Sequence, residues 1–156
     1  MILNLRAIRA QYLPEHLFLR YQWKSDRPGL AGFREGMSTI AQLVGQGTVE
    51  LVLLDMNGLP SLGLEEQAWL ALHWLPRVMS AAVRQVALVL PERNMYNQMV
   101  AESLLRGTRT FLRFDIQFFA DTAGGLDWLV GHQPIALAAL ETEWQEASHL
   151  SQALAS

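Results

Sequence analysis

The sequence has no cysteine and no long uninterrupted apolar stretch. Without thiols the chain has no disulfide scaffold, no thiolate nucleophile and no cysteine-ligated metal site, a composition typical of a reducing cytoplasm. Arg6 and Arg9 interrupt the amino-terminal segment before it reaches signal-peptide length, and no segment approaches the roughly 20 apolar residues that cross a bilayer. We therefore expect a cytoplasmic protein with no membrane span.

Charge is also scarce. Charged residues make up 17% of the chain, and the net charge is −3. The arginines and the one lysine, Lys24, are scattered from Arg6 to Arg113. Because nucleic-acid binding needs a clustered positive surface, nucleic acid is not an expected partner.

Recognisable catalytic and cofactor motifs are absent from the sequence. The four histidines are dispersed without the spacing of metal ligands, and no serine lies in a GxSxG turn. The glycines match neither a P-loop nor a dinucleotide fingerprint. We expect no metal, no cofactor and no enzymatic activity.

The most informative segment present is the run VELVLLD at residues 49–55, which ends at a turn-forming stretch. A branched, apolar run without alternation is typical of an interior strand of a largely parallel sheet, because both faces of that strand are covered. At 156 residues and 51% hydrophobic composition, the chain fits one domain of ordinary size. This strand is therefore the expected centre of an α/β domain.

The other elements follow from local periodicity. Alternation predicts a hairpin of strands over residues 4–12 and 16–23, the second strand having one covered and one partly wet face. Apolar spacing predicts a helix from Phe33 that ends at Gly45 or Gly47. Strands at 85–90 and 111–119 alternate with helices capped by Asn94 and Asp121. The order predicts an α/β fold with a mixed, mostly parallel sheet of about five strands and helices packed on it.

The helix that follows the central strand begins near Leu64 and contains a proline. Ala68, Leu72, Leu75 and Met79 mark its expected inward stripe. Pro76 should break or kink it, because proline lacks the amide donor and its ring collides with the preceding turn.

Past Pro134 a long amphipathic helix is expected. Its expected inward stripe comprises Leu137, Leu140, Trp144, Ala147, Leu150 and Leu154. We divide the chain into an α/β domain at 1–133 and this carboxy-terminal helical appendage at 134–156. The helix covers either its own body, which we favour, or a neighbouring subunit in a homodimer.

The order of elements, with LLDMNGLPS ending the central strand, resembles the STAS domain of anti-sigma factor antagonists. FREGM, EEQAWLALHWLPR, VALVLPE and FFADTAGGLDWL, in that order, resemble small bacterial proteins described as STAS-like or CRAL-TRIO-like. The resemblance implies a regulatory domain that acts through protein contacts. It also implies Ser61 as a phosphorylation candidate, although no acidic residue precedes it here, and a turn or helix-capping role is the alternative.

Several other residues are candidates for an interaction surface or a pocket. Asp55 and Asn57 follow the central strand, at the edge where open α/β sheets place their sites. Tryptophan and methionine adapt to apolar guests, so an aromatic and methionine-rich set could border a cavity or form ordinary core. That set comprises Trp69, Trp74, Met79, Met95, Tyr96 and Met99, with His73 beside it and Trp144 on the last helix.

Two functions follow as hypotheses. The first is a non-enzymatic cytoplasmic regulatory or protein-interaction domain with an unidentified protein partner. The second is a carrier or sensor of a small apolar ligand or lipid, which the CRAL-TRIO side of the resemblance implies. An enzyme built from Asp55, Asn57 and His73 is a third reading, and it requires these side chains to converge in the fold.

Overall fold

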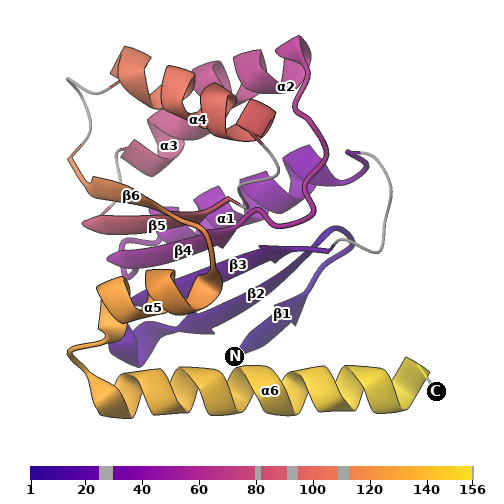
Figure 1. Cartoon of the computed structure of the whole chain (residues 1–156), viewed down its shortest axis with the longest axis vertical. Coiled ribbons are helices and arrows are strands. Elements are labelled where there is room, and N and C mark those ends of the chain that lie inside the picture. The colour runs from indigo at the N-terminus through magenta and orange to yellow at the C-terminus, as the bar shows by residue number, and fades with distance from the viewer. Residues whose placement is uncertain (25–29, 80–81, 91–94, 109–112, 156) are drawn as a thin grey trace.

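The chain folds into an α/β domain in which one sheet separates two layers of helices (Figure 1). The computed structural model describes residues 1–24, 30–79, 82–90, 95–108 and 113–155. The strands are β1 (Ile2–Asn4), β2 (Ile8–Leu13), β3 (Phe18–Trp23), β4 (Leu51–Asp55), β5 (Gln85–Val89) and β6 (Asp115–Phe119). The helices are α1 (Phe33–Gly45), α2 (Leu64–Trp69), the π-helix η2 (Leu70–Trp74), α3 (Leu75–Met79), α4 (Met95–Thr108), α5 (Thr122–Val130) and α6 (Pro134–Ala155), with a 3-10 turn η1 (Pro14–His16).

The sheet is mixed and mostly parallel, which confirms the predicted fold class. Its described part has six strands in the order β1-β2-β3-β4-β5-β6; the first two pairings are antiparallel and the next three are parallel. The predicted hairpin is confirmed by the antiparallel pairing of β2 with β3, but the prediction of one continuous strand over residues 4–12 is wrong. A turn in which the Leu5 amide donates to the Ile8 carbonyl divides that segment, and β1 is the additional strand.

Strand β4 lies in the interior of the sheet, as its sequence predicts. All five of its residues are buried. Val52 and Leu54 belong to the core beneath helices α1–α4, whereas Leu51 and Leu53 belong to the core on the opposite face. The unbroken apolar run therefore reflects burial from both sides.

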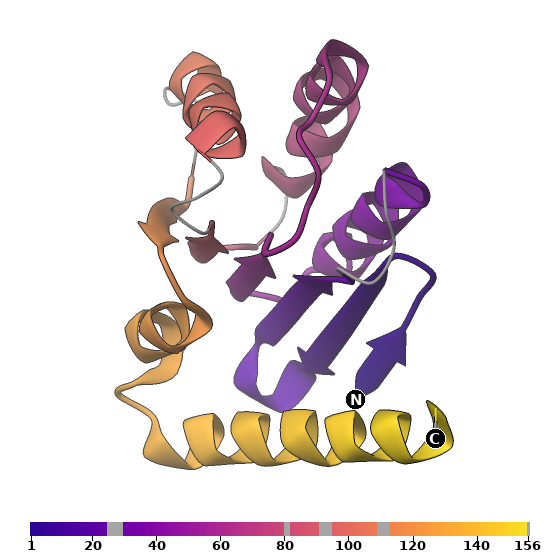
Figure 2. The same cartoon turned by 45° about the vertical axis from the view of Figure 1, so that its right-hand side comes forward.

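Helices α1 to α4 cover one face, and α5 and α6 cover the other (Figures 1 and 2). The predicted stripe of α1 is buried, and α1 ends at Gly45 as expected. The Asp121 side chain caps α5 by accepting from the Gly124 amide at 2.8 Å. Gly125 lets α5 approach the sheet, because a Cβ there would lie 2.8 Å from Leu53 Cδ1. Asn94, the other predicted cap, lies outside the described residues.

The segment from α2 to α3 differs from its prediction in two ways. It stays helical through Pro76, because the preceding η2 turn is π-helical and the Leu75 amide bonds to the Leu70 carbonyl. The predicted inward stripe is also wrong at Ala68 and Leu72, which are exposed, whereas Leu75 is buried and Met79 packs against the core. The buried residues of this segment are Leu70, Trp74, Leu75 and Val78.

Helix α6 docks on its own sheet. Ala136, Leu140 and Trp144 are buried against the body, so the part of β3 expected to be partly wet is covered. The last two residues of the predicted stripe, Leu150 and Leu154, are exposed. Within the described ranges, none of the helices combines the length and the apolar character required for a bilayer-spanning segment.

Candidate functional site

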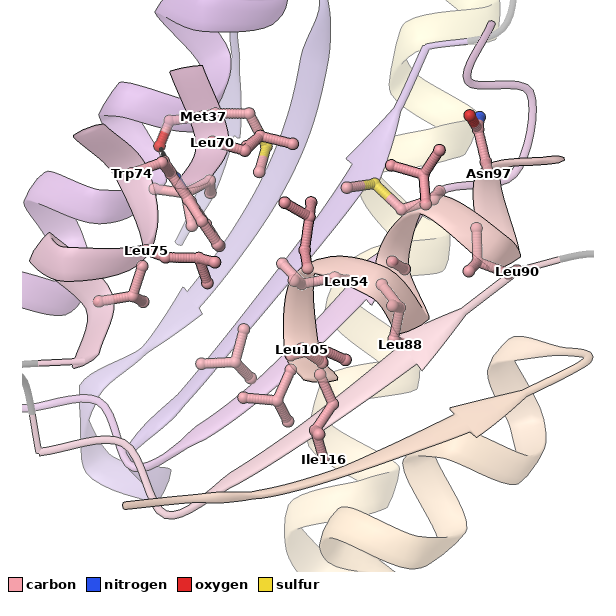
Figure 3. Close-up of a pocket in the computed structure, with 18 of the residues that line it drawn as sticks. Met37, Leu54, Leu70, Trp74, Leu75, Leu88, Leu90, Asn97, Leu105 and Ile116 are labelled. Carbon is pink, nitrogen blue, oxygen red and sulfur yellow. Dashed lines mark hydrogen bonds between the residues drawn. The ribbon is translucent and has the colours of Figure 1, made fainter. Parts of the chain in front are cut away.

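An apolar cavity of about 110 Å³ lies between the sheet and the helices above it (Figure 3). Val52 and Leu54 of β4, Val86 and Leu88 of β5, and Ile116 of β6 form its floor. Among the described residues that line it, two have a polar group in the side chain: Trp74, with its indole N–H, and Asn97, with its amide. Protein interiors are close-packed and rarely leave voids larger than a water molecule, so a space of this size is unusual for a protein core.

One wall is formed by α1 and the π-helical turn. The indole Nε1 of Trp74 donates to the Met37 carbonyl at 2.7 Å, and Trp74 is 8% exposed. This bond ties η2 to α1 and orients the Trp74 ring beside the cavity, as Figure 3 shows. Because a π-turn inserts one residue into the helical register, it places Leu70, Trp74 and Leu75 together on the cavity side.

Residues 56–62 and helix α4 border the end of the cavity near the carboxyl ends of the parallel strands. Met56, Leu59 and Leu62 contribute apolar side chains to the lining. Asn97 of α4, which is 3% exposed, fastens this loop. Its Oδ1 accepts from the Leu62 amide at 3.0 Å, and its Nδ2 donates to the carbonyls of Pro60 at 3.0 Å and Leu59 at 3.4 Å.

A second group of hydrogen bonds joins the starts of α2 and α4 at the surface. The Tyr96 hydroxyl donates to the Leu62 carbonyl at 3.1 Å. Gln67 Nε2 donates to the same carbonyl at 2.9 Å and lies 3.1 Å from the Tyr96 hydroxyl. Apart from these bonds, the backbone of α4 makes few close approaches to the backbones of the neighbouring elements. Side chains of α4, including Val100 and Ala101, therefore bridge to the core around an incompletely filled space.

A buried polar layer lies on the opposite face, under α6. The guanidinium carbons of Arg9 and Arg20 lie 4.0 and 3.9 Å from the ring centroid of Trp144. Arg9 also donates to the Trp144 carbonyl at 2.9 Å, and Gln11 Nε2 donates to the Leu140 carbonyl at 2.9 Å. These contacts connect β2 and β3 to the middle of α6, and each cation–π pair typically contributes about 0.5–2 kcal/mol.

Arg20 is the most enclosed charge of this layer, with 5% of its surface exposed. Burial lowers the pKa of its guanidinium, whereas Glu141 and Asp55 raise that pKa and Arg9 lowers it further. Within the described chain, Nε and Nη1 of Arg20 have no hydrogen-bond partner. The carboxylates of Glu141 and Asp55 thus favour the charged form of Arg20, although two of its nitrogen atoms make no hydrogen bond within the described chain.

Asp55 and Asn57 form a turn at the end of β4. Asp55 is 2% exposed, and its Oδ1 accepts from the Asn57 amide at 3.0 Å. Its Oδ2 accepts from Gln22 Nε2 and from Thr122 Oγ1, both at 3.4 Å. Asp55 therefore links the end of β4 to the start of α5, whereas the Asn57 side chain is exposed.

The remaining predicted residues are dispersed over the molecule. His73 is exposed on η2, on the face of the sheet that α1 to α4 cover. The Asp55 carboxylate bonds to Thr122 of α5 on the opposite face, so the two side chains do not converge. Ser61 is exposed, and the N-cap of α2 is Gly63 rather than Ser61. Trp69 packs edge-on against Phe33, with ring centroids 6.2 Å apart, and the Arg34 guanidinium lies 5.7 Å from its ring.

Of the aromatic and methionine set proposed for a pocket, the described lining includes Trp74. Tyr96 lies at the surface beside it, and Met95 and Met99 are exposed. Sequence reasoning missed Asn97, although a signal exists, because Asn97, Val100, Ala101 and Leu104 share the inward face of α4 at helical spacing.

Within the described chain, no group of three histidine or carboxylate side chains is placed to hold a metal ion.

Comparison with known proteins identifies no relative: no family model, no curated protein and no solved structure matches this chain. The resemblance to STAS domains therefore remains a hypothesis.

Proposed function

We propose that the protein binds a small apolar molecule, as a carrier or sensor, in the cavity between the sheet and helices α1 to α4. The single observation that carries this proposal is that apolar space, which has a volume of about 110 Å³. In an enclosed core, unfilled space costs stability at about 24 cal/mol per Å³, so this space costs at most about 2.6 kcal/mol. A bound guest would recover part of that free energy.

The size and lining of the cavity support such a guest. An engineered cavity of about 150 Å³ lined by Leu, Ile and Phe stays dry and binds benzene or xenon. Met37 and Met56 add flexible, polarisable side chains that adapt to the shape of a guest. These are the properties of a binding site and not of a reaction centre, because the lining supplies no acid, base or nucleophile among the described residues.

Native mass spectrometry of the protein purified from its own host tests this proposal. We expect a small molecule that remains bound under native conditions and is released on denaturation. The Val86→Ile variant, which extends a side chain into the cavity, should retain less of it. Val89→Ile adds the same methylene on the opposite face of the same strand and is the matched control. Absence of any retained molecule, together with no binding of apolar probes added to the purified protein, would contradict the proposal.

A regulatory or protein-interaction role is the second candidate, and a separate observation favours it. Ile135, Leu150 and Leu154 of α6 are 85%, 66% and 88% exposed, so this helix presents apolar side chains beyond its own docking contacts. A homodimer through α6 or another protein partner would cover them. Sedimentation equilibrium of the native chain and of a Leu150→Glu, Leu154→Glu variant tests the homodimer, which predicts a dimer that the variant abolishes. A native chain that remains monomeric at high concentration argues against it.

A further inference from the structure

The polar atoms of the cavity wall are already engaged in hydrogen bonds. The indole of Trp74 points its donor at the Met37 carbonyl, and the amide of Asn97 bonds to the backbone of residues 59–62. The floor consists of paired parallel strands whose amides and carbonyls form the ladder between β4, β5 and β6. Within the described lining, no side-chain donor or acceptor is therefore directed toward a guest.

Charge is equally absent from the lining. Arg, Lys, Asp, Glu and His do not occur among the described residues that form the cavity surface. A buried carboxylate or ammonium without a partner carries a large desolvation penalty, and even an uncompensated hydroxyl or amide costs roughly 1–3 kcal/mol on the scale of protein substitutions. The described part of the wall thus offers no charged partner to an acid or an amine and no free side-chain partner to an alcohol.

The volume sets a limit on size. At about 110 Å³, the cavity is smaller than the engineered cavity of about 150 Å³ that accepts benzene. Met37 and Met56 can shift to admit a ring, but a long acyl chain would have to protrude between the helices. The flat indole of Trp74, held by its hydrogen bond, gives the guest a fixed aromatic surface.

We infer that the cavity selects a neutral, hydrocarbon-like molecule about the size of one six-membered ring or a short branched chain, with no hydroxyl, amino or carboxyl group inside the protein. This inference rests on the proposed function and narrows its ligand class. A fatty acid or a phospholipid would have to leave its head group outside the cavity, because the described lining offers that group no partner.

Calorimetric and NMR titration of the full chain with benzene, phenol and benzoate tests the inference. These probes share one ring and differ in polarity. We expect benzene to bind with chemical shift changes confined to the cavity methyl groups, phenol to bind at least about tenfold more weakly, and benzoate not to bind. Phenol or benzoate binding in the cavity as tightly as benzene would overturn the inference while leaving apolar-ligand binding intact. Failure of all three probes to bind, with xenon also excluded, would overturn the proposed function itself.

A substitution that adds one hydroxyl to the wall provides an internal control. Val100 is 7% exposed on α4 and lines the cavity, and threonine has nearly the same shape. In a helix, the threonine hydroxyl can bond to the carbonyl four residues earlier, so Val100→Thr is compatible with the fold. In the variant, the ratio of the affinity for benzene to the affinity for phenol should fall by about threefold or more. An unchanged ratio in a folded variant would show that wall polarity does not set the selectivity.

Discussion

Adding one methylene to Val86 should stabilise the protein, because this side chain faces the cavity. Val86 is 5% exposed on β5 and belongs to the floor of the cavity. A buried methylene contributes about 0.8 kcal/mol. Filling roughly a quarter of the 110 Å³ space recovers a similar amount, about 0.6 kcal/mol, from the cavity term. We therefore expect Val86→Ile to raise the free energy of unfolding by about 0.5–1 kcal/mol.

Val89→Ile makes the same change on the other face of the same strand, where Val89 packs in the core beneath α5. Val89 is 1% exposed, and its Cγ2 lies 3.6 Å from the position a Cβ would take on Gly125. Gly125 places helix α5 against this part of the sheet, so an added methylene on Val89 would push against the helix. Overpacking of this kind typically costs about 1–3 kcal/mol.

Equilibrium urea unfolding, followed by circular dichroism, measures both effects in one experiment. The expected result is a higher midpoint for Val86→Ile and a lower midpoint for Val89→Ile, with unchanged denaturant dependence. Equal destabilisation by the two substitutions would refute the reasoning, because it would mean that the two faces of β5 are packed alike. Saturation of the native protein with benzene should reduce the advantage of Val86→Ile, since the added methylene and the ligand compete for the same space.

The other predictions concern the rest of the fold. Leu140→Ala in the docked part of α6 should lower the free energy of unfolding by about 2–5 kcal/mol, whereas Leu154→Ala, at an 88% exposed position, should change it by less than about 0.5 kcal/mol in the same assay. Burial raises the pKa of the Tyr21 hydroxyl, so part of the native stability is present below about pH 10 and is lost as the pH rises further; Tyr21→Phe should reduce that alkaline loss, and an unchanged pH profile would count against it. Asn97→Ala should cost about 2–3 kcal/mol by leaving the backbone of residues 59–62 without its buried partners, while Gln98→Ala, whose side chain bonds to a surface carboxylate, should have little effect.

The fold class could be predicted because local patterns and tertiary structure agree in the centre of the chain. The run at 49–55 lacks alternation, which indicates cover on both faces, and β4 is buried on both faces. The spacing from Phe33 to Val44 predicts the buried stripe of α1. Asp121 precedes a helix with the side chain needed for a cap, and it makes that bond.

The orientation of α2, η2 and α3 could not be predicted, because apolar residues occur almost all round this segment. Several faces were therefore compatible with the sequence. The bond from Trp74 to the Met37 carbonyl and the π-turn decide between them, and both depend on contact with α1, far away in the chain. Periodicity detects a stripe only where polar residues define the opposite face.

The cavity itself has no local sequence signal. Its volume depends on how far α4 stands from the sheet and on how residues 56–62 close the end, which are properties of the assembled layers. Trp74 could be proposed as a pocket residue from its type alone. Arg20 escaped notice because its partner in the structure, Trp144, lies on the last helix, and sequence alone gives no reason to pair them.

The proposed function requires that the space beside Trp74 accept an apolar guest. Exposure of crystals of the native chain to xenon gas measures this directly, because xenon has no hydrogen-bonding or charge interactions and marks only accessible apolar space. The account predicts one well-occupied xenon atom between Met37, Trp74 and Val100, and a weaker one in Val86→Ile. A native core that takes up no xenon there, with side chains in van der Waals contact across the site, would contradict it.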